Sequence, residues 1–154
     1  MSFNIEVPYF KQESWFTCGS ACLRMVLAYL GIMRTEKEVT EACGTTELGT
    51  TSMQISAAFQ RFGVKASSVK NANIEDLKQE INERRPVIVL IDPSHIYGGV
   101  GGFGHFIVIF GFKDGEIKYH DPDEPDGEYM KSDLETFLLA WNATRCWMVK
   151  IEKE

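Results

Sequence analysis

The chain has 154 residues, of which 44% are hydrophobic and 25% are charged, and its formal net charge is −6. This length and composition predict one globular domain that is long enough to bury a core of its own. The negative charge and the lack of any basic run argue against a nucleic-acid partner and against attraction to anionic membranes.

The first six residues, Met1–Glu6, do not contain the cationic and apolar segments of a secretory signal. The longest apolar runs, Val87–Ile91 and Phe106–Phe110, are far shorter than the ~20 residues that span a bilayer. We therefore expect a cytoplasmic protein without a membrane segment, whose four cysteines are reduced.

The first elements along the chain are an extended segment and an apolar helix. Residues 5–12 alternate briefly between apolar and polar, and Pro8 limits them to an edge strand or an extended arm. Helix-forming residues then predict a helix that begins at about Cys18, with Gly31 as its stop.

Three further helices are expected before residue 86. Thr35 and Glu38 form a capping box for a short helix that ends near Cys43–Gly44. Ser52 is expected to cap the next helix, which ends at Gly63. Apolar residues at helical spacing over 74–81 predict a fourth helix, which must stop before Pro86.

The second half of the chain has the pattern of an antiparallel sheet. The expected strands are Val87–Ile91, His105–Phe112, Glu116–His120, Glu128–Lys131 and Arg145–Ile151. Ser132 and Glu135 suggest a second capping box, which opens a helix through Trp141. Helices first and an antiparallel sheet second predict an α+β fold of two lobes, with a cleft between them as a natural ligand site.

Cys18 is the first candidate for chemistry. It stands where a polar loop becomes a helix, and a helix N-terminus favours the thiolate through its free N–H groups and its dipole. Gln12, six residues upstream, carries an amide that can donate to an oxyanion beside the sulfur. We interpret the pair as a nucleophile with part of an oxyanion hole.

A cysteine nucleophile needs an imidazole and a group that orients it. His105 opens a strand after a glycine-rich loop, and Asp121 lies on the return strand of the hairpin. A three-residue loop over Lys113–Gly115, with Gly115 left-handed, would place Asp121 opposite Ile107 and diagonal to His105. A two-residue turn would put Asp121 on the other face. We therefore predict the three-residue loop.

These residues carry a resemblance. Val7-Pro8-Tyr9-Phe10-Lys11-Gln12, then Cys18-Gly19 before an apolar helix, then Gly104-His105 and Asp121-Pro122, resemble the papain-like cysteine peptidases. More narrowly, the sequence looks like the bacteriocin-processing, double-glycine leader peptidase family, over about residues 7–147. In its well-known members an aspartate precedes the cysteine, where this chain has Thr17.

The resemblance implies a papain-like (cysteine proteinase) fold, with an N-terminal helical lobe packed on a C-terminal antiparallel β-sheet. We expect a single domain over residues 1–154, with the helical lobe at about 13–85 and the sheet lobe at about 86–151. The resemblance implies Cys18 as nucleophile, His105 as general base, Asp121 as orienter and Gln12 as oxyanion donor. The expected partner is a peptide or protein substrate. The narrower resemblance, to the double-glycine leader peptidases, implies a glycine-rich or double-glycine site in that substrate.

The loops that flank these residues are open to two interpretations. Trp15 and Phe16 either line the cleft beside Cys18 or anchor their loop to the core. Residues 98–104, which include Gly102 and Gly104, are either a substrate-binding flap or groove wall, or a loop without such a role. Trp15, Gly102 and Gly104 are the candidate substrate-binding residues.

No cofactor is expected. Cys18 and Cys22, with a histidine, have the spacing of one ligand pair of a zinc site, but the sequence has no second ligand pair. We expect Cys22, Cys43 and Cys146 to be structural. Two other functions stay open: a non-catalytic peptide-binding module on the same fold, and an acyl transferase or deamidase that uses the same triad. The oligomeric state is open too.

Overall fold

The computed structural model describes residues 3–152 as one antiparallel sheet with helices on both sides. The strand order is β2 (Ala66–Val69), β7 (Met148–Ile151), β3 (Val87–Ile91), β4 (His105–Lys113), β5 (Glu116–His120) and β6 (Met130–Asp133), with β1 (Phe3–Asn4) paired to β4. The helices within the same range are α1 (Cys18–Tyr29), α2 (Glu36–Cys43), α3 (Ser52–Arg61), α4 (Ile74–Asn82), α5 (Ser94–Tyr97) and α6 (Leu134–Asn142).

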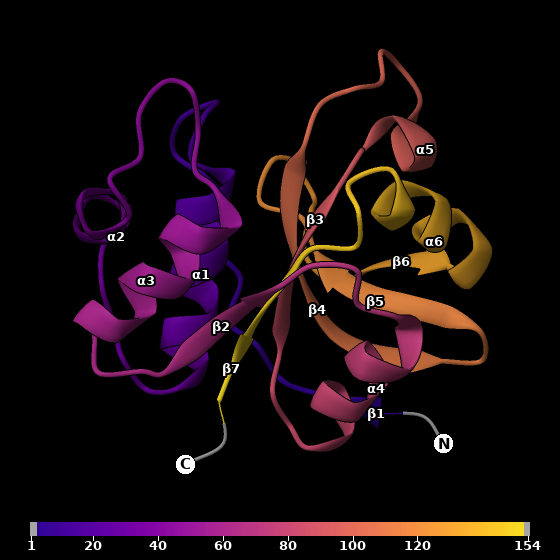
Figure 1. The fold of residues 1–154 in the computed structure, drawn as a ribbon, viewed down its shortest axis with the longest axis horizontal. Coiled ribbons are helices and arrows are strands. Elements are labelled where there is room, and N and C mark those ends of the chain that lie inside the picture. Colours follow the sequence, from indigo (N-terminus) through magenta and orange to yellow (C-terminus); the bar gives the residue numbers. More distant parts are fainter. Residues whose placement is uncertain (1–2, 153–154) are drawn as a thin grey trace.

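The helices form two groups that are separated by the sheet (Figure 1). Helices α1, α2 and α3 lie together on the left, where α1 packs on β4 and α3 packs on β2 and β7. Helices α5 and α6 lie on the right, where α6 packs on β3, β5 and β6. The α+β class predicted from the sequence is confirmed, although β2 comes between two helices rather than after all of them.

Capping explains where several helices begin. The capping box of Thr35 and Glu38 forms as predicted, and Gly44 closes that helix in the left-handed conformation. The prediction that Ser52 caps α3 was off by one residue, because Thr51 is the cap and shares its box with Gln54. The predicted capping box of Ser132 was also wrong, because Asp133 caps α6 by accepting a hydrogen bond from Thr136 N–H.

The β4–β5 hairpin has the register that places Asp121 near His105, but not through the predicted turn. Lys113 pairs with Glu116, so the connection is a two-residue turn, and the predicted three-residue loop is wrong. Asp114 and Gly115 both have positive φ, 51° and 77°, as a type I′ turn requires. A bulge at Phe110, between Ile109 and Gly111, then shifts the register by one residue.

The bulge has the same consequence that the longer loop would have had. Val108 pairs with His120, so the next position along β4, Ile107, lies beside Asp121. His105 is two residues further along β4 and on the same face as Ile107. The extra residue is therefore supplied inside β4 instead of at the turn.

His120 is a buried residue of the core. Its Nε2–H donates to the Val7 carbonyl at 2.8 Å, and its Nδ1 accepts from Tyr129 N–H at 3.0 Å. The rings of Tyr9, Phe110 and Tyr129 surround it. A carbonyl only accepts and an N–H only donates, so these partners select the neutral Nε2–H tautomer.

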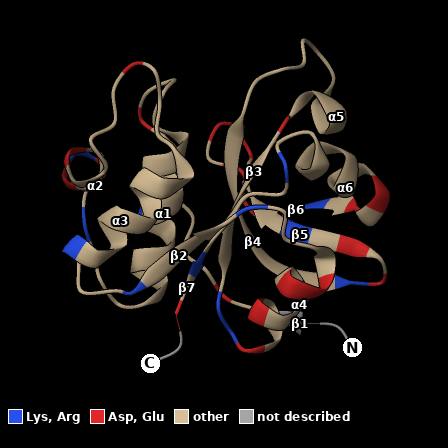
Figure 2. Cartoon of the chain, in the orientation of Figure 1, with Lys and Arg blue, Asp and Glu red and all other residues tan. Residues whose placement is uncertain are grey.

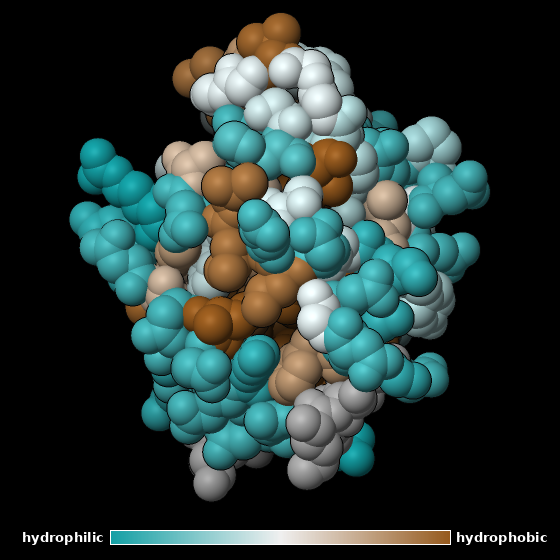
Figure 3. Space-filling view, turned by 90° about the vertical axis from the view of Figure 1, so that its right-hand side faces the viewer, coloured by the Kyte–Doolittle hydropathy of each residue, from teal (hydrophilic) through white to brown (hydrophobic). Residues whose placement is uncertain are grey.

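Apolar and charged residues are distributed unevenly over the surface. On the side that carries α5 and α6, an apolar area runs across the middle of the face and is edged by hydrophilic residues (Figure 3). Leu139 of α6 is 55% exposed. Acidic residues gather on α4, and the upper part of α1 carries few charges (Figure 2). Over residues 3–152, every helix is too short or too polar to cross a bilayer.

The environment of His120 predicts a pH dependence of stability. Burial lowers the pKa of His120 below 6.5, so the unfolded chain binds a proton that the folded protein excludes. We expect the free energy of unfolding to fall as the pH decreases below about 6.5. In the variant His120→Gln, which does not titrate, the fall between pH 7 and pH 5 in urea unfolding should be smaller. Equal slopes for both proteins would contradict this assignment.

Candidate active site

Cys18 is the first residue of α1 and is only partly buried. The side chain of the N-cap residue, Thr17, makes no capping hydrogen bond and instead bonds to Ser14. The helix dipole and the N–H groups of the first turn therefore face the thiol without a side-chain cap. Gly19 lets the helix approach α3 and β4, because a Cβ there would lie 3.2 Å from Ile55 and Thr50 and 3.3 Å from Phe106.

His105 and Asp121 are brought together by the shifted register of the hairpin. His105 Nε2 lies 2.6 Å from Asp121 Oδ1, and their side chains are 12% and 1% exposed. Cys18 lies close enough to the same imidazole to raise the pKa of His105. The structure thus assembles three of the four residues that the sequence analysis selected, from α1, β4 and the end of β5.

The electrostatics of this group favour a charged imidazole. Burial by itself lowers the pKa of His105, but the hydrogen bonds and negative charges of Asp121 and Cys18 outweigh it and raise the pKa to about 10. For Asp121, burial raises the pKa, but the hydrogen bond and charge of His105 lead to a net lowering. The pair is therefore an imidazolium beside a carboxylate at neutral pH.

The backbone around Asp121 leaves no room for a side chain at residue 127. Asp121 N–H donates to the Gly127 carbonyl at 2.7 Å, and a Cβ on Gly127 would lie 1.8 Å from the Asp121 carbonyl oxygen. Tyr9 from the N-terminal arm donates its O–H to that oxygen at 3.0 Å. Asp123 N–H donates to Oδ1 at 3.0 Å. These contacts fix the loop after β5 and with it the carboxylate.

Gln12 lies at the end of the same arm and is 9% exposed. Its backbone N–H donates to the Pro122 carbonyl at 2.9 Å, which ties the arm to the segment that follows Asp121. Its side-chain Nε2 donates to the Ser14 carbonyl at 2.8 Å with one of its two N–H bonds. Its Oε1 is buried and has no hydrogen-bond partner in the described part of the chain.

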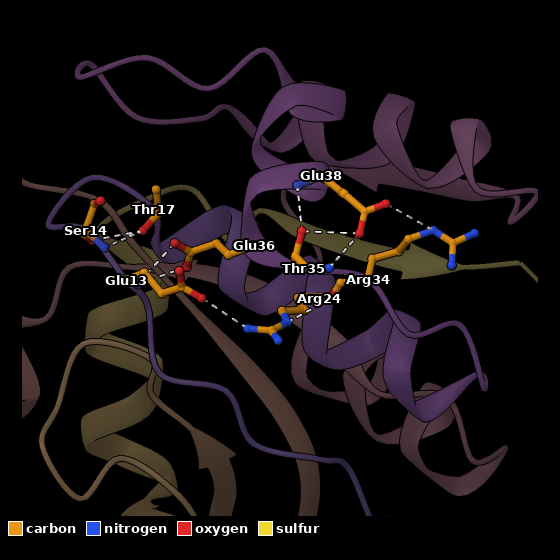
Figure 4. A network of polar contacts seen from close by, with 8 residues as sticks. All are labelled: Glu13, Ser14, Thr17, Arg24, Arg34, Thr35, Glu36 and Glu38. Carbon is orange, nitrogen blue, oxygen red and sulfur yellow. Dashed lines mark hydrogen bonds and ion pairs between the residues drawn. The ribbon is translucent and has the colours of Figure 1, made fainter.

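A buried carboxylate holds the loop between Gln12 and Cys18. Glu36, at the start of α2, is 4% exposed and accepts from Glu13 N–H at 3.0 and 3.1 Å. Figure 4 shows Glu36 beside Glu13 and Thr17, with Arg24 reaching the Glu13 carboxylate. Burial is the main reason that the pKa of Glu36 is raised. The second helix thus fastens the loop that carries Gln12.

Cys18 opens onto a groove of 490 Å³ that lies between the α1 and α3 side and the sheet. Its walls carry no charged side chain. The lining residues are Cys18, Leu48, Gly49, Thr50, Thr51, Ser52, Met53, Leu90, Gly104, Phe106 and Trp147. Leu48 and Met53, on the α2–α3 side, are 98% and 67% exposed.

The glycine-rich loop forms part of the other wall. Gly104 lines the groove, and a Cβ there would lie 2.9 Å from Leu90 Cδ1. Gly102 is outside the lining, and its N–H donates to Asp92 Oδ2 at 2.9 Å. Trp15 is also outside the lining; it is 76% exposed and its ring contacts Phe16. Of the three candidate substrate-binding residues, the structure thus places one in the groove.

Comparisons with known proteins show the family to which the chain belongs. Residues 4–149 match the Peptidase_C39 like family. The chain belongs to this family. An uncharacterized protein of Methanothermobacter marburgensis is 32% identical over 113 residues, which cover 73% of this chain and 69% of that protein. The predicted resemblance to the double-glycine leader peptidases is confirmed, and this C39-like protein is placed among the cysteine peptidases.

Two solved structures share the fold. A Bacillus anthracis protein described as C39-like superposes with a TM-score of 0.83 at 16% identity, covering 100% of this chain and 98% of the other. A double glycine motif protease from an AMS/PCAT transporter, in complex with the leader peptide, superposes with a TM-score of 0.72 at 21% identity and covers 99% of both chains. The predicted papain-like fold is confirmed.

The sequence analysis of this C39-like chain did not select three polar residues near the site. Asp92 is 7% exposed and accepts from the N–H groups of Ser94 and Gly102. Glu36 directly follows Thr35, the N-cap residue of α2. Tyr97, whose O–H reaches Asp121 Oδ2, follows no motif. The signal for Asp92 was the sequence Asp92-Pro93-Ser94, in which an aspartate binds the N–H two residues on.

The other cysteines and the acids offer no second site. Cys22, Cys43 and Cys146 are buried, and burial raises the pKa of each thiol, that of Cys43 to about 11. This burial is what the expected structural role requires. Within residues 3–152, no cluster of three or more His, Cys, Asp or Glu side chains is arranged to hold a metal ion.

The network at Glu36 predicts a local loss of stability. The variant Glu36→Ala leaves the Glu13 N–H without its acceptor, which costs about 1–3 kcal/mol. Urea unfolding measures this cost. Glu36→Gln keeps one acceptor oxygen and should lose less. Glu41→Ala, an exposed position of the same helix, is the matched control, and a Glu36→Ala variant as stable as this control would contradict the prediction.

Proposed function

We propose that this C39-like protein is a cysteine peptidase that hydrolyses a peptide bond with Cys18, His105, Asp121 and Gln12. The observation that carries the proposal is the hydrogen bond of 2.6 Å between His105 and Asp121, with Cys18 on the same imidazole. Nucleophile, base and orienter then stand in the order that thiol hydrolases use.

The first half of the proposed reaction is acylation of the cysteine. The Cys18 sulfur attacks the scissile carbonyl carbon, and the resulting oxyanion accepts from the Cys18 N–H and from the Gln12 amide. The imidazolium of His105 gives its proton to the leaving amine as the C–N bond breaks. Because His105 Nε2 is hydrogen-bonded to Asp121 Oδ1, the proton that His105 gives to the amine is the one on Nδ1. A thioester on Cys18 remains.

In the second half of the proposed reaction, water hydrolyses the thioester and the free enzyme is restored. His105 takes a proton from a water molecule, and the hydroxide adds to the thioester carbonyl in the same oxyanion hole. The C–S bond breaks, the carboxylic acid leaves, and the sulfur and the imidazole are again a thiolate–imidazolium pair. Asp121 stays ionised throughout and holds the imidazole in one orientation.

The lining of the groove indicates which kinds of substrate residue flank the scissile peptide bond. Its uncharged lining is suited to an apolar or glycine-rich chain rather than to a charged one. Leu90, Phe106 and Trp147 are the large side chains on the sheet side of the lining, which suits small residues in the substrate. The similar double glycine motif protease, solved with its leader peptide, supports a peptide with a double-glycine site as the first substrate to test.

Alkylation by iodoacetamide at neutral pH tests the proposed nucleophile. We expect labelling confined to Cys18, because the other three thiols are buried with raised pKa values. His105→Ala should slow the labelling of Cys18 and lower cleavage of a double-glycine peptide by roughly 10²–10⁴-fold. Mass spectrometry of peptides locates the label.

The controls separate the other functions. His95→Ala removes a histidine away from the site and should leave labelling and cleavage unchanged. A Cys18 that reacts no faster than a free thiol contradicts the proposal. Tight binding of the double-glycine peptide without cleavage would indicate a binding module. Amide products formed with an added amine, in preference to the acid, would indicate an acyl transferase.

A further inference from the structure

The Asp121 carboxylate has a second oxygen that the proposed reaction does not use. Oδ1 accepts from His105 Nε2 at 2.6 Å and from Asp123 N–H at 3.0 Å. Oδ2 accepts from the Tyr97 hydroxyl at 2.7 Å. The side chain of Asp121 is 1% exposed, so its charge depends on these donors rather than on water.

The direction of the hydrogen bonds at Tyr97 follows from the number of protons. Its hydroxyl oxygen also lies 2.9 Å from that of Tyr119, and 3.6 Å from the weakly accepting sulfur of Met130. A carboxylate can only accept, and Tyr97 has a single O–H. Tyr97 therefore donates to Asp121, and Tyr119 donates to Tyr97. Burial raises the pKa of both phenols, so both keep their protons at neutral pH.

Separate elements hold the two phenols in place. Tyr97 is the last residue of α5, and its N–H donates to the Pro93 carbonyl at 2.9 Å. Asp92 Oδ1 fixes the start of this helix by accepting from Ser94 N–H at 3.0 Å and Ser94 Oγ at 2.7 Å. Tyr119 belongs to β5 and is fully buried. The hydroxyl that faces Oδ2 is thus held from the loop side and from the sheet.

We propose that Tyr97 is a positioning residue for the peptidase reaction, which fixes the rotation of the Asp121 carboxylate so that Oδ1 stays on His105. This proposal rests on the proposed function. The terminal torsion of an aspartate is broad, so a carboxylate that is held at one oxygen only is free to turn. A donor at Oδ2 removes that freedom and draws part of the negative charge away from the imidazole.

Several other titratable groups face Asp121 and set the background for a test. They are His105 on β4, Tyr119 on β5, Cys22 on α1, Tyr9 on the arm, and Glu124 in the loop after β5. Of these groups, His105 donates to the carboxylate, and it does so at Oδ1. Tyr97 is the donor to Oδ2.

The variant Tyr97→Phe removes the O–H and keeps the ring. We expect kcat for a double-glycine peptide to fall roughly tenfold, the effect of one hydrogen bond to a charged group, with little change in KM. Without the donor at Oδ2, the carboxylate keeps more of its negative charge beside the imidazolium, even though its rotation is no longer fixed. The pKa of His105, followed by NMR of its ring protons, should therefore be higher than in the wild type.

Tyr29→Phe is the matched control, because it removes a phenolic O–H that donates to the Arg84 carbonyl, outside the Asp121 network. It should keep kcat and the titration of His105 close to those of the wild type. A Tyr97→Phe variant with unchanged kcat and unchanged titration overturns the proposal. Equal losses of kcat in both variants, with the His105 titration unmoved, also overturn it, since they indicate a structural role.

The NMR titration separates this inference from the proposed function. It needs no turnover, so a wild-type protein that cleaves no peptide contradicts the peptidase proposal and still leaves the effect of Tyr97 on His105 measurable. A shifted titration in Tyr97→Phe would then support the link between Tyr97, Asp121 and His105 in an inactive site. An unshifted one would contradict it.

Discussion

The buried charge of Asp121 is the constraint on which the rest of the site depends. A carboxylate that is 1% exposed is tolerated only where donors replace the water that it has lost. The donors come from β4, α5 and the following loop, as His105, Tyr97 and the Asp123 N–H. Each element must therefore be in register before the charge is stable, which couples the formation of the site to the folding of the sheet.

The N-terminal arm is anchored to the same segment of the chain as the buried carboxylate. Tyr9 bonds to the carbonyl of Asp121, and Gln12 N–H bonds to the carbonyl of Pro122. The loop that leads from Gln12 to Cys18 is then held from the other side by Glu36. The candidate oxyanion donor, the candidate nucleophile and the candidate orienter are thus tied to one another through the main chain, although more than one hundred residues separate them in sequence.

The features that the sequence predicted correctly are those that local interactions determine. The capping box of Thr35 with Glu38 uses residues three apart, and the helix at Cys18 is a run of helix formers; both are where they were expected. The short strand β2 was missed because its residues, Ala66–Val69, include two serines and are only half-buried. Its place is determined by pairing with β7, at the far end of the chain.

The hairpin shows why a correct contact was predicted through a wrong turn. The face of His105 requires one extra residue between it and Asp121, and the sequence offered Gly115 as the position for it. The structure instead has a regular two-residue turn and places the extra residue at Phe110. That residue packs its ring 4.6 Å from His120, a contact that no local pattern reveals. Tertiary packing, and not the turn residues, decides where the strand accepts a bulge.

The two histidines of the hairpin, His105 and His120, differ in their surroundings, and these surroundings shift their pKa values in opposite directions. His120 lies among aromatic rings with a carbonyl on Nε2, and burial keeps it neutral. His105 is also buried, but it faces a carboxylate and a thiol, which reverse the sign of the pKa shift. Without the extra residue at Phe110, His120 would lie opposite Ile109 on the face of His105, and Asp121 would turn to the other face. The bulge at Phe110 is therefore as much a part of the proposed chemistry as the residues that it places, because it decides whether Asp121 or His120 shares the face of His105.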